Sequence, residues 1–155
     1  MLSQSKRQTS YEFYKNALKL AIGGGVVFWA TTLATTLATS LLPIAAEYRA
    51  AFSKNSWNIQ TVWVDSLLAG MIIGWCVSYS LLRFMEKNPI ENPIQKSTIL
   101  SFIALVIAVI LIDVPQSFLL LGPSDAWHYL LIGIMLNVPR FLFLGIVIGY
   151  RYKEG

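Results

Sequence analysis

Four long runs of apolar residues, almost free of charge, most constrain what this chain can fold into. They are Leu20–Ala46, Ser66–Leu82, Ser97–Ser124 and Ala126–Tyr150. Charged residues make up 13% of the 155 residues, against about 25% in an ordinary soluble domain. A helix that crosses a bilayer needs about 20 mainly apolar residues, and the runs lack the alternating pattern of membrane barrel strands. The sequence therefore predicts an all-α integral membrane protein, a bundle of four transmembrane helices.

Turn residues and apolar runs together give the expected bounds of these helices. We expect one membrane domain over residues 1–155, with helices at 17–46, 60–84, 97–121 and 126–150. Tyr11–Lys19 is predicted to form a helical lead-in to the first of them. The sequence "GPSD" at Gly122–Asp125 is typical of a tight turn. The third and fourth helices should therefore form an antiparallel hairpin.

The basic residues predict the orientation in the membrane. Nine of them fall in the N-terminal tail, the connection between the second and third helices, and the C-terminus, whereas Arg49 and Lys54 alone fall on the other side. The positive-inside rule then places both termini in the cytoplasm of a multi-pass cell-membrane protein. Because topology accounts for the net charge of +4, the lipid bilayer is the expected partner and no nucleic acid is needed.

Small residues on the first two helices predict close helix packing. The second helix carries a small residue at every fourth position, at Ser66, Gly70, Gly74 and Ser78. The first carries three glycines at 23–25 and a Thr-rich stretch at 30–40. Helices in lipid associate through such residues because these let the backbones approach closely. We interpret the two faces as a packing seam within the chain or in a homo-oligomer, with a Thr-lined pore as the alternative.

Four polar residues in the middle of the last two helices need a separate explanation. They are Asp113, Gln116, Asn137 and Arg140. Counted from Ser124 at about 1.5 Å per residue, Asp113 lies about 16 Å and Arg140 about 24 Å from the hairpin tip. A charge at the bilayer centre costs roughly 2.5–3.5 kcal/mol on insertion scales. We therefore predict a buried cluster in which Asp113 neutralises Arg140 across the hairpin.

Two prolines flank this predicted cluster. Pro115 and Pro139 cannot donate to the carbonyls one turn before them, so each helix should kink there. Paired interruptions at similar depth are typical of midplane sites in transporters. The four polar residues are thus either a structural lock or a site for a ligand or ion.

The remaining residues argue against catalysis. The one histidine, His128, has no His or Cys companion for a metal or haem, and no cofactor is expected. No phosphate-binding loop and no Ser-His-Asp arrangement is present. We expect a non-enzymatic membrane subunit that associates with copies of itself or with other membrane subunits. The alternative is an oligomeric carrier or channel for a small solute or ion.

Overall fold

The computed structural model describes residues 10–41, 43, 59–84 and 92–154. Within these residues every element is helical and no strand occurs, which confirms the all-α prediction. In chain order the elements are α1 (Ser10–Ser40), α3 (Ile59–Phe84), α4 (Pro93–Ala108), a π-helical turn η2 (Val109–Asp113), α5 (Val114–Leu121) and α6 (Pro123–Glu154). Together they give four helical segments that are long and apolar enough to cross a membrane.

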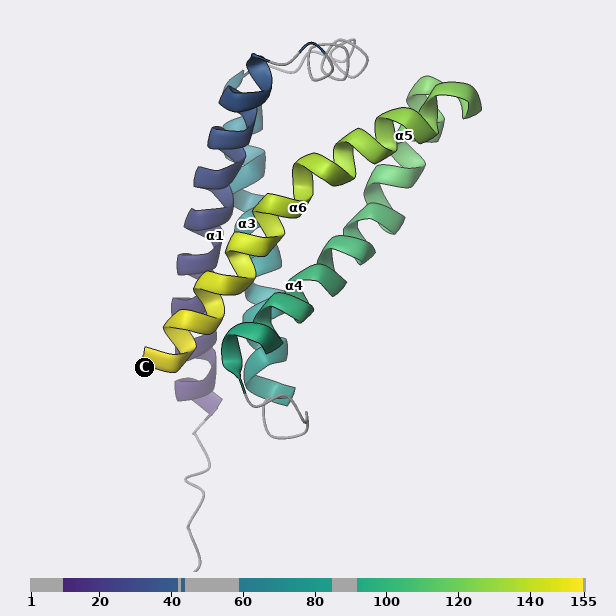
Figure 1. The fold of residues 1–155 in the computed structure, drawn as a ribbon. Coiled ribbons are helices and arrows are strands. Elements are labelled where there is room, and N and C mark those ends of the chain that lie inside the picture. Colours follow the sequence, from purple (N-terminus) through teal and green to yellow (C-terminus); the bar gives the residue numbers. More distant parts are fainter. Residues whose placement is uncertain (1–9, 42, 44–58, 85–91, 155) are drawn as a thin grey trace, which may run out of the picture.

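The helices pack as two antiparallel pairs joined through α1. Helices α1 and α3 lie side by side, and α4, η2 and α5 together form a hairpin with α6 (Figure 1). Helix α1 also packs along α6, so it contacts both pairs. The start of α1 and the end of α6 lie at the same end of the molecule, and the α5 end of the hairpin diverges from α1 and α3 (Figure 1).

Local sequence signals explain where the helices begin and end. The side chain of Asn92 caps α4 by accepting a hydrogen bond of 3.0 Å from the backbone N–H of Ile94, and Pro93 occupies a first-turn position that needs no donor. Gly122 alone separates α5 from α6, with a φ of 76° that glycine adopts readily. The predicted tight turn is therefore present. Residues 44–58 and 85–91, where the sequence analysis expected connections and the end of the first helix, lie outside the described residues.

The third helix departs from the continuous segment expected at 97–121. It begins earlier, at Pro93, and it is interrupted by the π-helical turn η2, in which the N–H of Val114 bonds to the carbonyl of Val109. Pro115 gives the physical reason, because its ring has no N–H and crowds the carbonyl of Leu111. Widening the preceding turn relieves that crowding. Pro139, by contrast, lies inside the uninterrupted helix α6.

The core lies between α1, α3, α4 and α6. Its fully or almost fully buried side chains are Leu20, Phe28, Val77, Leu81, Leu105, Phe141, Leu144 and Ile148. Many large apolar side chains point outward instead, including Leu111, Leu119 and Met135, which are 68%, 84% and 74% exposed. Soluble monomers rarely expose apolar surface on this scale. An apolar exterior of this kind suits a multi-pass membrane protein.

Candidate functional site: a polar cluster at mid-helix

Arg140, in the middle of α6, joins that helix to α1 through a polar contact near the end of α1. Its Nε donates to Thr35 Oγ1 at 3.2 Å, and its Nη1 donates to Asn137 Oδ1 at 3.0 Å. Thr35 was not among the predicted site residues. Its position in the Thr-rich stretch could have indicated a polar contact, but the sequence alone could not show which of these threonines faces α6.

Asp113 reaches the same group from the last residue of the π-helical turn. The Asn137 side chain and the Arg140 charge both lie close enough to influence the Asp113 carboxyl. Because Asn137 Oδ1 accepts from Arg140, the amide nitrogen of Asn137 is the group that can donate to Asp113. Asn137 therefore stands between the two charges. We call Thr35, Asp113, Asn137 and Arg140 the mid-helix cluster.

The predicted direct ion pair is not seen: no salt bridge joins Asp113 to Arg140, both of which the structure describes. The two side chains are also only partly buried, as are Asn137 and Gln116. Gln116 makes no hydrogen bond to the other three predicted site residues among the described side chains. The one charged side chain that is buried in the described part of the chain is Lys96, at 2% exposure in the first turn of α4. From the sequence, Lys96 was expected in the connection between the second and third helices, as one of the nine basic residues on that side.

The predicted packing residues of α3 divide into two kinds. Gly70 and Gly74 lie against α1, where an added Cβ would come within 3.0 Å of the Gly25 carbonyl oxygen and 2.9 Å of the Ala21 carbonyl oxygen, respectively. Ser78 is fully buried, and its hydroxyl has no hydrogen-bond partner among the described residues. Ser66 is only partly buried and donates to the carbonyl of Trp63 in its own helix. Backbone contact between α1 and α3 therefore centres on Gly70 and Gly74.

A second small-residue interface, between α4 and α6, was missed from the sequence. Ser97 Oγ donates to the carbonyl of Gly145 at 2.6 Å, and Ser101 Oγ donates to that of Phe141 at 2.5 Å. Gly149 packs directly on the first turn of α4, near Ile94. Two sequence features could have indicated this interface: the Gly-x-x-x-Gly motif at 145–149 and the two serines four residues apart at 97 and 101.

Four threonines of α1, at positions 31, 32, 35 and 36, direct their hydroxyls to their own helix. Thr31, Thr32 and Thr36 donate to carbonyls three or four residues earlier, at 2.7–2.9 Å. Thr35 does the same, and its oxygen also accepts from Arg140. Hydroxyls that satisfy their own backbone suit helix packing. They do not favour the alternative of a Thr-lined pore.

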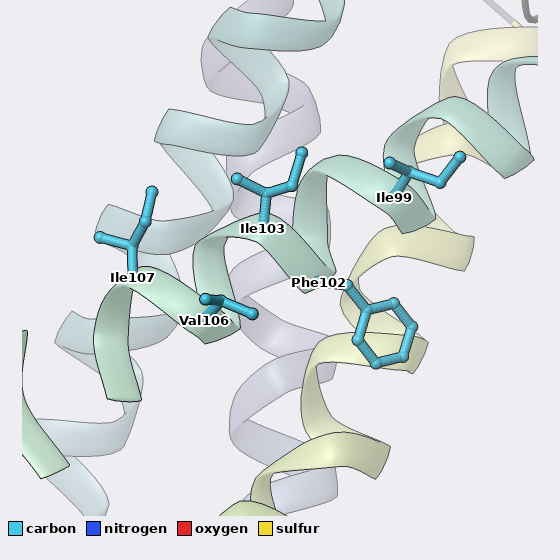
Figure 2. Close-up of a pocket in the computed structure, with 5 residues that line it drawn as sticks. All are labelled: Ile99, Phe102, Ile103, Val106 and Ile107. Carbon is cyan, nitrogen blue, oxygen red and sulfur yellow. The ribbon is translucent and has the colours of Figure 1, made fainter. Parts of the chain in front are cut away.

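A surface hollow on α4 lies away from the mid-helix cluster and is lined by apolar side chains. Ile99, Phe102, Ile103, Val106 and Ile107 line it along one side of α4 (Figure 2). Specific sites for small molecules need a few placed polar groups to orient the ligand, and this hollow offers none. It is suited to contact with lipid chains.

Metal-ligating side chains do not gather in the described part of the chain, where no three His, Cys, Asp or Glu residues come together. His128 packs edge to face against Tyr129, with ring centroids 5.4 Å apart. No protein-family model, no curated protein and no solved structure gives a significant match to this chain.

Proposed function

We propose that the chain is a multi-pass membrane protein with both termini in the cytoplasm that acts as a non-enzymatic subunit of a membrane assembly. The common end of α1 and α6 (Figure 1) and the nine-to-two bias of basic residues support this topology. Two interfaces of small residues hold the chain together internally, at α1–α3 and at α4–α6. They leave the outer faces of the helices available to lipid and to other subunits.

The partial exposure of the mid-helix cluster carries the proposal. Asn137 and Arg140 lie midway along α6, and Asp113 lies about two turns before the end of α5, yet the chain itself covers each of them only in part. In hydrocarbon, ionisable side chains face a protein interior or a water-filled cavity and mark functional positions. A neighbouring membrane subunit, either a second copy or another chain, would cover the cluster and provide further polar contacts.

Site-specific cross-linking in native membranes tests this proposal. In a Cys76→Ser background, cysteine is placed at Phe143, one turn beyond Arg140 on α6 and 48% exposed. The matched control is Ile103→Cys, 49% exposed in the apolar hollow of α4. We expect a discrete cross-linked species from position 143 and none from position 103. A chain that stays monomeric at both positions would contradict the subunit proposal.

A second candidate, a carrier or channel for a small solute or ion, is favoured by one observation. Asp113 ends a π-helical turn two residues before Pro115, and such turns occur frequently at functional sites. In this case the exposed side of the cluster would face water. Because this candidate is expected to act as an oligomer, a cross-link at position 143 agrees with it too, and solute-dependent protection of Phe143→Cys from a water-soluble thiol reagent is the result that would favour it over the subunit role.

A further inference from the structure

Arg151, near the end of α6, lies directly across the backbone of α1. An added Cβ at Gly23 would come within 2.8 Å of Arg151 Nη1 and 2.9 Å of its Cδ. Only a residue without a side chain leaves this space, so the Arg151 side chain packs directly on the backbone of Gly23. Gly23 is buried and Arg151 remains exposed. The Arg151 side chain therefore lies over the Gly23 backbone while part of its surface stays accessible.

The direction of the helices explains how Arg151 reaches this position. Side chains on a helix lean toward its N-terminus, so Arg151 leans back along α6, away from the end of the molecule. Helix α1 runs antiparallel to α6 and enters its apolar run after Lys19. Gly23 lies one turn beyond Lys19 on the same face of α1. The guanidinium thus sits at the boundary between the basic end of α1 and its apolar run.

A second cation lies on the same face of α1. Lys19 is exposed four residues before Gly23, and Lys15 is exposed one turn earlier still. Glu12 is the acidic residue in the first turn of α1, about two turns from Lys19. A guanidinium with an ammonium on the neighbouring helix at the membrane boundary matches the phosphate of a lipid headgroup, because arginine presents several donors to phosphate oxygens.

We propose that Arg151, which packs on Gly23, and Lys19 form a binding site for the phosphate of an anionic phospholipid between α1 and α6. The inference rests on the proposed membrane insertion but not on a subunit role. Anionic lipids of the cytoplasmic leaflet attract basic residues near its surface. The site goes further than general attraction, because one arginine is positioned by a glycine that has no other neighbour within the same distance.

The test measures lipid selectivity of the full-length chain in nanodiscs of phosphatidylcholine with and without phosphatidylglycerol. Retained lipids are identified by native mass spectrometry, and the unfolding midpoint is measured in phosphatidylcholine alone. Wild type should retain phosphatidylglycerol preferentially. Arg151→Gln and Lys19→Gln should each reduce this preference about fivefold, the effect of one basic residue near a membrane surface. Lys153→Gln is the control, an exposed cation two residues from Arg151 that should retain the preference.

Gly23→Ala separates a positioned arginine from simple charge. The new methyl group displaces Arg151 without removing its charge, and alanine is the better helix former, so the midpoint in phosphatidylcholine should not fall. The preference for phosphatidylglycerol should fall as in Arg151→Gln. Wild-type selectivity in both of these variants, or equal losses in Lys153→Gln and Arg151→Gln, would overturn the proposed site. Displacement of the lipid by inorganic phosphate, but not by chloride at the same ionic strength, would show a site for free phosphate and overturn the assignment to lipid.

Discussion

Asn137 is the residue on which the mid-helix cluster depends. Its Oδ1 accepts a hydrogen bond from Arg140, and its amide lies close enough to Asp113 to influence that carboxyl, so it lies near both charges. An amide can serve both because it offers an acceptor and donors on one planar group. Asp113, on the π-helical turn, and Arg140, bonded to Thr35 of α1, are thereby connected across three segments of the chain.

At this scale we predict coupling between Asp113 and Arg140 that passes through Asn137. Asp113→Leu and Arg140→Leu should each destabilise the chain, at the lower end of the roughly 3–5 kcal/mol that breaking a fully buried pair costs, because both side chains are partly exposed. The double variant should recover much of the loss. The measurement is equilibrium unfolding of the four proteins in mixed detergent micelles.

The role of Asn137 is checked by repeating this cycle with Asn137→Leu. We expect the coupling energy to shrink, since the amide that joins the two charges is gone. Undiminished coupling would mean that Asp113 and Arg140 interact directly. Strictly additive losses in the original cycle would mean that each charge is stabilised by a different neighbour.

The sequence predicted part of this site and missed part of it. Asp113, Asn137 and Arg140 were found because charge and amide groups are conspicuous in apolar runs. Their arrangement in space was not predicted. The π-helical turn at 109–113 changes the direction in which the Asp113 side chain leaves the helix, compared with a regular α-helix. Gln116, expected to join them, makes no hydrogen bond with them among the described side chains. Thr35 comes from a helix about a hundred residues away, a pairing that no local pattern specifies.

Among the elements, α3 and α6 each place glycines against the backbone of a neighbouring helix. Gly74→Leu should therefore damage the α1–α3 pair severely, since its first carbon already meets the carbonyl of Ala21 at 2.9 Å. Helices without a strong hydrophobic drive between them cannot compensate for lost contact. Thermal unfolding and size-exclusion chromatography measure the damage. Cys76→Leu, an exposed small-to-large change two residues away, is the control and should behave as wild type.

The serines of α4 give a milder test of the second interface. Ser101→Ala removes the hydrogen bond to the carbonyl of Phe141 and should cost about 0.6 kcal/mol, with an upper limit of about 1.7 kcal/mol, as for other interhelical bonds in membranes. Ser66→Ala removes a bond within one helix and should have a smaller effect. Equal losses of unfolding free energy in the two variants would show that the hydrogen bond between α4 and α6 stabilises the chain no more than a bond within one helix.

Helix positions were largely predictable, whereas the interruption in the third one was not. Apolar length gave four segments, and the glycine-proline step marked the turn at Gly122. The start of the third helix was expected at 97, whereas it begins four residues earlier, at Pro93, with Asn92 as its cap. Pro115 and Pro139, which share a preceding valine, both indicated a kink, but Pro139 lies in an unbroken helix. The different outcomes depend on packing around each proline, which the sequence does not contain.

For the whole molecule, the decisive prediction is its topology. Cysteines at Lys15, Gln95 and Lys153 should react with a membrane-impermeant reagent from the cytoplasmic side, and a cysteine at Ser124 from the opposite side. All four positions are exposed, whereas Lys96 is buried and would report poorly. Reaction of Gln95→Cys and Ser124→Cys from the same side would contradict the four-helix topology, since α4, η2 and α5 separate the two positions.

The central place of α1 has a consequence for changes in chain length. Its three consecutive glycines have different neighbours, namely Arg151 at Gly23, Ile148 at Gly24 and Met71 at Gly25, while Thr35 meets Arg140 further along. Inserting one residue between Gly25 and Thr35 would turn everything beyond it by about 100° around the helix axis. Both sets of contacts could then not be kept at once. The protein should therefore tolerate insertions and deletions between its helices far better than a single added or lost residue within α1.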